Sequence, residues 1–140
     1  HFQRTDVYNK YYNPGGILTA SEYRFPFEDA EFDFVYLTSV FTHMLRRDVE
    51  HYLEEIARVL RPGGRCLASF FLLDERTNPG RARTGFPDAA EGCQLRSREM
   101  PEWEVAYEES EARLMYAQSG LQIQEPIRYG IQDSVVAVKP

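Results

Sequence analysis

The clearest hydrophobic pattern lies between residues 31 and 73 and predicts a strand, a helix and a second strand. From Phe32 to Thr38 the chain is aromatic and β-branched with apolar residues at successive positions, which is typical of a parallel strand covered on both faces. Apolar residues then recur with a helical period from 49 to 60, and the Pro-Gly-Gly sequence at 62–64 ends this helix. Residues 65–73 follow as a second buried strand, so the region predicts a right-handed βαβ unit.

The region that follows has two parts with different patterns. Residues 74–107 hold several prolines, glycines and arginines without a clear period, which indicates a long loop, either functional or mobile, or else a disordered surface segment. Residues 108–119 predict an amphipathic helix that ends at Gly120. The strands expected at 121–129 and 134–138 are joined by only four residues, so they should be antiparallel neighbours.

Length and charge narrow the class of protein. The chain has 140 residues, of which 43% are hydrophobic and 27% charged, as in a single globular domain. A six-stranded doubly wound sheet needs about 180 residues, so only part of one fits. The net charge of −6 argues against nucleic acid and anionic lipid as partners. No apolar run approaches the roughly 18 residues of a membrane span, no signal peptide is visible, and the two cysteines favour a reduced, cytoplasmic protein.

Four segments, taken in order, resemble those of class I S-adenosylmethionine-dependent methyltransferases. They read FPFEDAEFDFV at 25–35, SVFTHM at 39–44, EIARVLRPGGR at 55–65 and YEESEARLMYAQSGL at 107–121. The resemblance implies an α/β fold with a partial Rossmann-like sheet, a C-terminal antiparallel strand pair and helices packed on the sheet. It also implies S-adenosylmethionine as the cofactor and a small molecule as the methyl acceptor.

The glycine-rich turn of that family has no counterpart in this sequence. No Gly-x-Gly occurs, and Gly15-Gly16 follows Asn13-Pro14 rather than a buried strand. We therefore expect residues 1–140 to form a single truncated domain that is inactive or binds weakly on its own. Its expected parts are the family's third strand, near residues 2–7, with a turn-rich connection (1–30), the βαβ core (31–73), the loop (74–107), and the helix with the closing hairpin (108–140). The alternatives are a non-catalytic interaction domain or relic of this fold, and a different doubly wound protein that binds another ligand.

The resemblance also assigns candidate cofactor contacts. Asp6 matches the acidic residue that accepts a hydrogen bond from the adenine amino group, and Val7 packs beside the ring. Leu37 and Thr38 match the end of the strand where cofactor contacts are made. The structural alternatives are a turn-capping role for Asp6 and an ordinary strand-to-helix connection at Thr38.

The remaining candidates concern catalysis and binding of the methyl acceptor. His43 follows the central strand and could be a general base, because imidazole titrates near neutral pH, or it could be a packing residue at a helix start. Trp103 and Tyr107 could line a substrate pocket, or belong to the core. The arginines at 76, 81 and 83 could bind a carboxylate or lie in a solvated loop. No metal-ligand spacing, nucleophile elbow or phosphate-binding loop is present.

One expectation concerns partners. In the family the strand that matches residues 32–38 pairs with a strand that this sequence lacks. The apolar edge from Phe32 to Thr38 would then be bare, and natural proteins cover such edges. We expect either the N-terminal segment to fold back over it or a second copy of the chain to pair with it in a homodimer.

Overall fold

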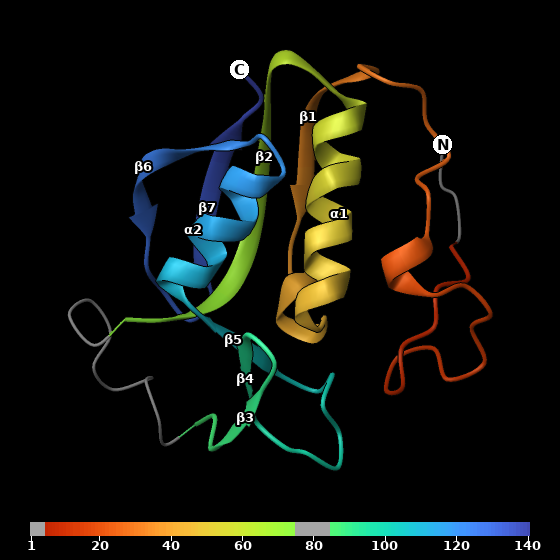
Figure 1. Cartoon of the computed structure of the whole chain (residues 1–140), viewed down its shortest axis with the longest axis vertical. Helices are drawn as coiled ribbons and strands as arrows, with labels where there is room; N and C mark the ends of the chain where they lie inside the picture. The colour runs from red at the N-terminus through yellow and green to blue at the C-terminus, as the bar shows by residue number, and fades with distance from the viewer. Residues whose placement is uncertain (1–4, 75–84) are drawn as a thin grey trace.

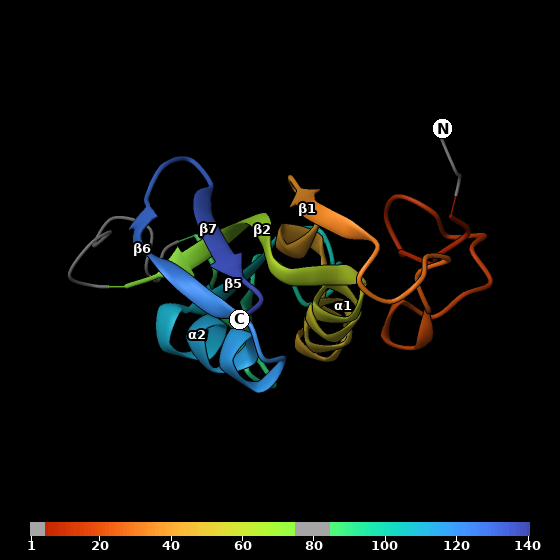
Figure 2. The ribbon, with the colours of Figure 1, turned by 90° about the horizontal axis from the view of Figure 1, so that it is seen from above.

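A mixed sheet with its two main helices on one face organises the chain (Figures 1 and 2). The computed structural model describes residues 5–74 and 85–140. The helical elements are η1 (Ala20–Glu22), η2 (Phe41–His43), α1 (Arg46–Val59) and α2 (Glu109–Gln118). The strands are β1 (Phe32–Leu37), β2 (Leu60–Leu73), β3 (Asp88–Ala90), β4 (Cys93–Leu95), β5 (Val105–Glu108), β6 (Gln122–Arg128) and β7 (Asp133–Val138).

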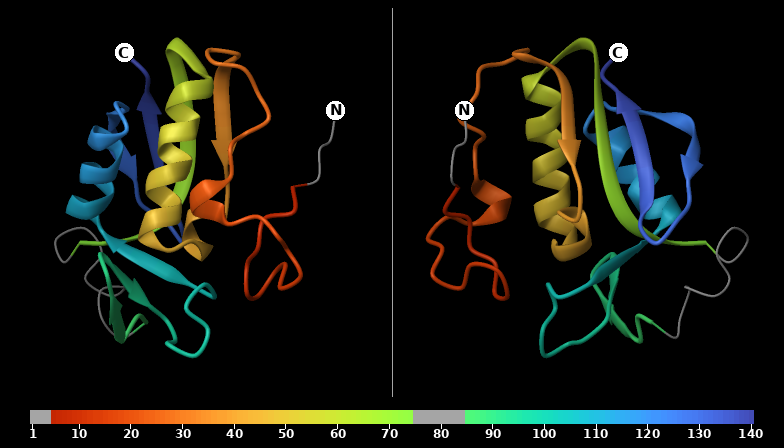
Figure 3. Two further views of the ribbon diagram at one scale, coloured as in Figure 1. Left: turned by 45° about the vertical axis from the view of Figure 1, so that its right-hand side comes forward. Right: turned by 180° about the vertical axis from the view of Figure 1, so that it is seen from behind.

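The predicted βαβ unit and closing hairpin are both confirmed. β1 pairs in parallel with β2 through the crossover helix α1, with Tyr36 opposite Leu67. On its other edge β2 pairs antiparallel with β7, where Leu67 lies opposite Val136, and β7 pairs antiparallel with β6. The core strands therefore run in the order β1-β2-β7-β6, and their C-terminal pair is antiparallel as expected (Figure 3).

The boundary between α1 and β2 differs from the prediction. The helix ends at Val59, and Leu60 is already extended, so Leu60 to Gly64 belong to the strand rather than to a helix terminus. The buried stripe of α1 includes Leu53 and Ile56, which pack into the core against the sheet. Gly63 has a φ of +78°, a conformation that a side chain rarely adopts, and it falls where the chain turns into the paired part of β2.

The prediction of an unstructured loop over residues 74–107 was wrong for the described part of this region. β5 pairs in parallel with the end of β2, and β4 and β3 add to it as antiparallel strands. Cys93, expected in a loop, lies buried in β4. Strands of three or four residues are too short to give a recognisable alternation, and they form here because the end of β2 offers them a ladder to join.

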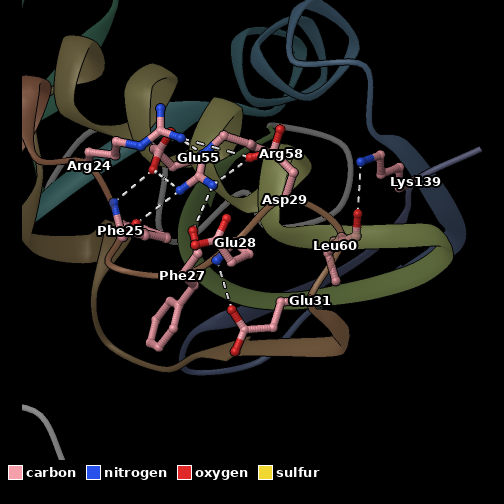
Figure 4. Close-up of polar contacts among 10 residues, drawn as sticks. All are labelled: Arg24, Phe25, Phe27, Glu28, Asp29, Glu31, Glu55, Arg58, Leu60 and Lys139. Atoms are coloured by element: carbon pink, nitrogen blue, oxygen red, sulfur yellow. Dashed lines mark hydrogen bonds and ion pairs between the residues drawn. The ribbon is translucent and has the colours of Figure 1, made fainter.

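The N-terminal segment forms no sheet strand in its described residues, 5–30. Val7 makes one isolated parallel bridge with Leu18, and residues 2–4 of the strand expected at 2–7 lie outside the described part. Further along, Glu55 and Arg58 of α1 hold this segment (Figure 4). Glu55 accepts a hydrogen bond from the backbone N–H of Phe25 at 2.7 Å, and Arg58 donates to the carbonyl oxygens of Phe25 and Phe27.

The two faces of β1 are not equally covered, contrary to the prediction. Phe34 and Tyr36 are 54% and 60% exposed, whereas Leu37 is buried. Both α-helices of the described chain lie on the other face of the sheet (Figure 2), which leaves the Phe34 and Tyr36 side chains in solvent. No strand of the described residues pairs with the outer edge of β1, so the expected cover by the N-terminal segment is not observed.

Candidate functional site

A cavity of about 460 Å³ opens where the N-terminal segment, the connection after β1 and the first turns of α1 meet. This volume is within the range usual for small-molecule sites. Ser39 and Val40, two and three residues after the end of β1, belong to its wall. The cavity therefore lies at the carboxyl end of a parallel strand, which is where open α/β sheets bind their ligands.

Asn9 shapes the N-terminal wall of this cavity. Its Oδ1 accepts hydrogen bonds from the backbone N–H groups of Tyr11 and Tyr12, at 3.0 and 2.9 Å, and so forms an Asx turn. Its Nδ2 donates to the carbonyl oxygen of His43 at 3.2 Å. The tyrosine-rich segment is thereby folded against the connection after β1, and Tyr8 and Tyr12 line the cavity.

His43 lies in this wall with both ring nitrogens engaged. Nδ1 is 3.2 Å from the carbonyl oxygen of Glu102, which can only accept, so Nδ1 carries the proton and donates. Nε2 is then the acceptor for the hydroxyl of Tyr12, also at 3.2 Å. The ring of Tyr12 meets the imidazole edge-on, with centroids 4.8 Å apart. In its neutral form the ring is therefore the Nδ1-protonated tautomer, with the phenol of Tyr12 at Nε2.

The helix contributes a carboxylate and a phenol, one turn apart. Asp48 and Tyr52 both line the cavity from α1. Burial raises the pKa of the Asp48 carboxyl, and this outweighs the lowering by the backbone of Leu45 and Ser21 and by the neighbouring Arg47 and His51 charges. Burial also raises the pKa of the Tyr52 phenol to about 12, so this group stays protonated at neutral pH.

Of the four residues expected to contact the cofactor, only Val7 lines the cavity. Asp6 accepts a hydrogen bond from Asn13 Nδ2 at 3.1 Å, and its backbone carbonyl accepts from two further N–H groups of the same turn. Leu37 is buried in the core, and Thr38 is exposed just beyond β1. The local contacts of Asp6 are those of a residue that stabilises a turn.

Trp103 and Tyr107, the residues expected at a substrate pocket, do not line the cavity. The indole of Trp103 stacks on the ring of Tyr11, with centroids 5.5 Å apart, beside a smaller depression of about 90 Å³. Tyr107 is fully buried and its hydroxyl donates to the carbonyl oxygen of Met44 at 2.7 Å, so it belongs to the core. The arginines at 76, 81 and 83 lie outside the described residues.

The described residues hold neither a metal-binding cluster nor a membrane-spanning helix. Residues 5–74 and 85–140 contain no group of three or more histidine, cysteine, aspartate or glutamate side chains arranged to hold a metal ion. In the same ranges, none of the helices has the length and apolar character required to cross a membrane.

Sequence reasoning missed most of the cavity wall. The missed residues come from three separate parts of the chain: Tyr8 and Tyr12, then Asp48 and Tyr52, and finally Glu102. The one local signal was the density of tyrosines just after residue 7. Nothing in the sequence pattern showed that this run folds back against the start of α1.

Part of the chain matches a protein family model, and most of it superposes on solved structures. Residues 5–68 match the family model described as a methyltransferase domain. Among solved structures, a SAM-dependent methyltransferase from Methanosarcina mazei superposes with a TM-score of 0.58 at 19% identity, over 86% of this chain and 64% of that one. The human N-acetylserotonin methyltransferase, solved with SAM, gives a TM-score of 0.60 at 21% identity, over 86% of this chain and 32% of that one.

A third match has the same character. The 1,6-didemethyltoxoflavin-N1-methyltransferase of Burkholderia thailandensis, solved with 1,6-didemethyltoxoflavin and S-adenosylhomocysteine bound, gives a TM-score of 0.58 at 17% identity. It is covered over 48% of its length by 86% of this chain. The chain thus spans less than two thirds of each of these three proteins. Residues 5–68 match the methyltransferase family, and the chain has the fold of a class I methyltransferase-like domain.

Proposed function

We propose that this chain takes part in S-adenosylmethionine-dependent methyl transfer to a small-molecule acceptor, with the cavity beside His43 as the binding site. The observation that carries the proposal is the position of this cavity at the carboxyl end of β1, next to the connection that includes Ser39 and Val40. Ligands of open α/β sheets bind at such ends. The family match over residues 5–68 covers this strand and supplies the reaction class.

The residues of the wall fit part of the cofactor. Val7 and Val40 offer apolar contacts for a planar ring, and the volume of about 460 Å³ suits a ligand of nucleoside size. Asp6 would have to exchange its hydrogen bond from Asn13 for one from the adenine amino group. When bound, S-adenosylmethionine supplies a methyl group activated on a sulfonium sulfur. Because the sequence has no Gly-x-Gly turn, we expect binding by this chain alone to be weak.

The chain's own residues would orient the acceptor and receive its proton. Transfer of an activated methyl group depends on alignment, and on proton removal where the acceptor carries one. The Tyr12 hydroxyl, exposed to the cavity, donates to His43 Nε2. A proton lost by an acceptor at Tyr12 can therefore pass to His43, whose Nδ1–H is held by the carbonyl oxygen of Glu102.

The test is calorimetric titration of this chain with S-adenosylmethionine. We expect a dissociation constant nearer millimolar than micromolar, and we expect Val7→Trp, which fills the cavity, to abolish the signal. Ile17→Trp is the matched control, because this exposed side chain belongs to the same segment but does not line the cavity. Absence of binding at millimolar cofactor, or equal loss in both variants, would contradict the proposal.

A second function, a non-catalytic interaction domain of this fold, is favoured by the residues expected to contact the cofactor, because only Val7 among these four lines the cavity. The same titration separates the two functions. Micromolar binding of the cofactor by this chain would exclude the non-catalytic reading. Binding that is absent under every condition, in a chain that still folds, would favour it.

A further inference from the structure

The cavity wall is acidic and aromatic. Two carboxylates, Asp48 and Glu102, and three phenol rings, Tyr8, Tyr12 and Tyr52, belong to its lining. Within the described residues, no lysine or arginine side chain lines it. This composition bears on what the cavity can bind, because a ligand must match both the charge and the shape of its site.

Cations near the cavity do not neutralise this wall. Lys10 donates through its backbone N–H to Glu102 Oε2 at 2.6 Å, while its ammonium donates to the carbonyl oxygen of Glu99 at 2.8 Å. Arg47 and His51 act electrostatically on Asp48, yet neither lines the cavity. None of these three positive residues belongs to the lining of the cavity.

The carboxylate of Asp48 is the group that most requires a partner. It is half-buried, and its desolvation is only partly compensated by the backbone at Leu45 and Ser21. A cation placed beside it would regain the interaction lost with water. An anionic ligand would instead be repelled by both carboxylates, and a neutral ligand would leave the Asp48 charge as it is.

The tyrosines supply the second element of cation recognition. The face of an aromatic ring attracts an ammonium within about 6 Å of its centre, by about 0.5–1 kcal/mol at exposed sites. Tyr12, which is 62% exposed, and Tyr8 present such rings on one side of the cavity, and Tyr52 lies on the side of α1. Rings from both the N-terminal segment and α1, together with the carboxylates of Asp48 and Glu102, form a setting that an organic cation fits.

From this geometry we infer that the cavity binds an organic ammonium ion, so that the methyl acceptor of this site is an amine. The identification of the ammonium ion as the acceptor rests on the proposed function, whereas the preference for a cation does not. An ammonium nitrogen first gives up a proton, which passes through Tyr12 to His43. Its free lone pair then bonds to the methyl carbon as the carbon–sulfur bond breaks, and the sulfur keeps that electron pair.

The experiment compares three small probes by calorimetry on this chain without cofactor: benzylamine, benzyl alcohol and benzoate. At neutral pH these are a cation, a neutral molecule and an anion of similar size. We expect benzylamine to bind at least tenfold more tightly than benzyl alcohol, and benzoate not to bind. Equal binding of all three, or preference for benzoate, would overturn the inference.

Matched variants test the residues that carry the argument. Asp48→Asn should weaken benzylamine binding about tenfold and leave benzyl alcohol unchanged, while Glu54→Gln, an exposed carboxylate of the same helix outside the cavity, should change neither. Tyr12→Leu should weaken binding of benzyltrimethylammonium, which has no N–H to donate, by a factor of about two to five. This variant alters an exposed side chain and keeps the test valid if Asp48→Asn does not fold. Equal effects of Asp48→Asn and Glu54→Gln would contradict the inference.

Methyl transfer assays then distinguish the inference from the proposed function. Cation preference without any methyl transfer supports the inference and counts against the proposed function. Methyl transfer to neutral or anionic acceptors, without cation preference, does the reverse.

Discussion

The sharpest stability prediction concerns Arg58, which joins α1 to the N-terminal segment. Its guanidinium donates to Glu55 through Nε at 2.8 Å and Nη2 at 2.7 Å, and to three further oxygens of residues 25–29. The side chains of Glu55 and Arg58 are only 9% and 15% exposed (Figure 4). The substitution Arg58→Met keeps the apolar stem and removes the charge. It leaves the Glu55 carboxylate buried, where it still accepts the hydrogen bond from the N–H of Phe25.

The size of the effect follows from this burial. Removing one partner of a fully buried ion pair costs about 3–5 kcal/mol, because the other charge stays uncompensated. Both side chains here keep some contact with water, so we expect Arg58→Met to lower the free energy of unfolding by about 2–3 kcal/mol. The double variant Arg58→Met/Glu55→Gln should be less destabilised than Arg58→Met alone, because it buries an amide in place of a charge.

The assay is urea unfolding at pH 7 with Arg61→Met as the matched control. Arg61 also pairs with a carboxylate, because its Nη1 donates to both oxygens of Asp33, but these side chains are 52% and 81% exposed. Such pairs contribute at most about 1 kcal/mol. With a slope of about 1–3 kcal/mol per M of urea, the two midpoints should differ by roughly 1 M. Equal losses in the two variants would refute the argument from burial.

The same pair predicts a dependence on pH. Hydrogen bonds from Arg58 lower the pKa of the Glu55 carboxyl below its ordinary value of 4.5. A carboxyl with a lowered pKa in the folded state contributes stability at pH values above its unfolded pKa, and this contribution declines as the pH falls through the folded value. Wild-type stability should therefore fall more steeply below about pH 4.5 than that of Glu55→Gln. Parallel curves would contradict this expectation.

The remaining predictions concern the core, a thiol and the sheet edge. Tyr107→Phe should lower the free energy of unfolding in urea by about 1–2 kcal/mol, because it removes the donor to the buried carbonyl of Met44. Tyr116→Phe should be neutral or stabilising, because the Tyr116 hydroxyl has no hydrogen-bond partner among the described residues. Equal losses would contradict it. Burial raises the pKa of the Cys66 thiol to about 12, so an alkylating reagent at pH 8 should modify Cys66 only after unfolding, and rapid reaction of the folded chain would count against the packing seen. Pairing of two copies along the edge from Phe32 to Thr38 remains a prediction, which sedimentation at rising concentration tests and a strictly monomeric chain would oppose.

The sequence alone determined the elements whose signals are local. The periodic stripe of α1, the left-handed glycine after α2 at Gly120 and the short link between β6 and β7 each depend on neighbouring residues. All three were predicted, although α1 ends at Val59, before the Pro-Gly-Gly sequence expected to end it. The C-terminal antiparallel pair also followed from the family resemblance, and β6 and β7 form it. Such signals can be recognised in the sequence because helix periodicity, turn length and glycine conformation are short-range properties.

Only the tertiary structure decided the short strands and the cavity. β3, β4 and β5 form because the end of β2 provides backbone partners for this group of strands. A local pattern of three or four residues cannot predict such pairing. His43 was a candidate from sequence, but its Nδ1 proton is held by Glu102, 59 residues away along the chain, and its phenol partner is Tyr12, 31 residues away. Asp48 reads in the sequence as a favourable charge at the start of a helix, and it becomes a cavity carboxylate once the N-terminal segment packs beside it. Burial and charge at a site are set by which segments meet there, and contacts between distant segments leave no periodic trace in the sequence.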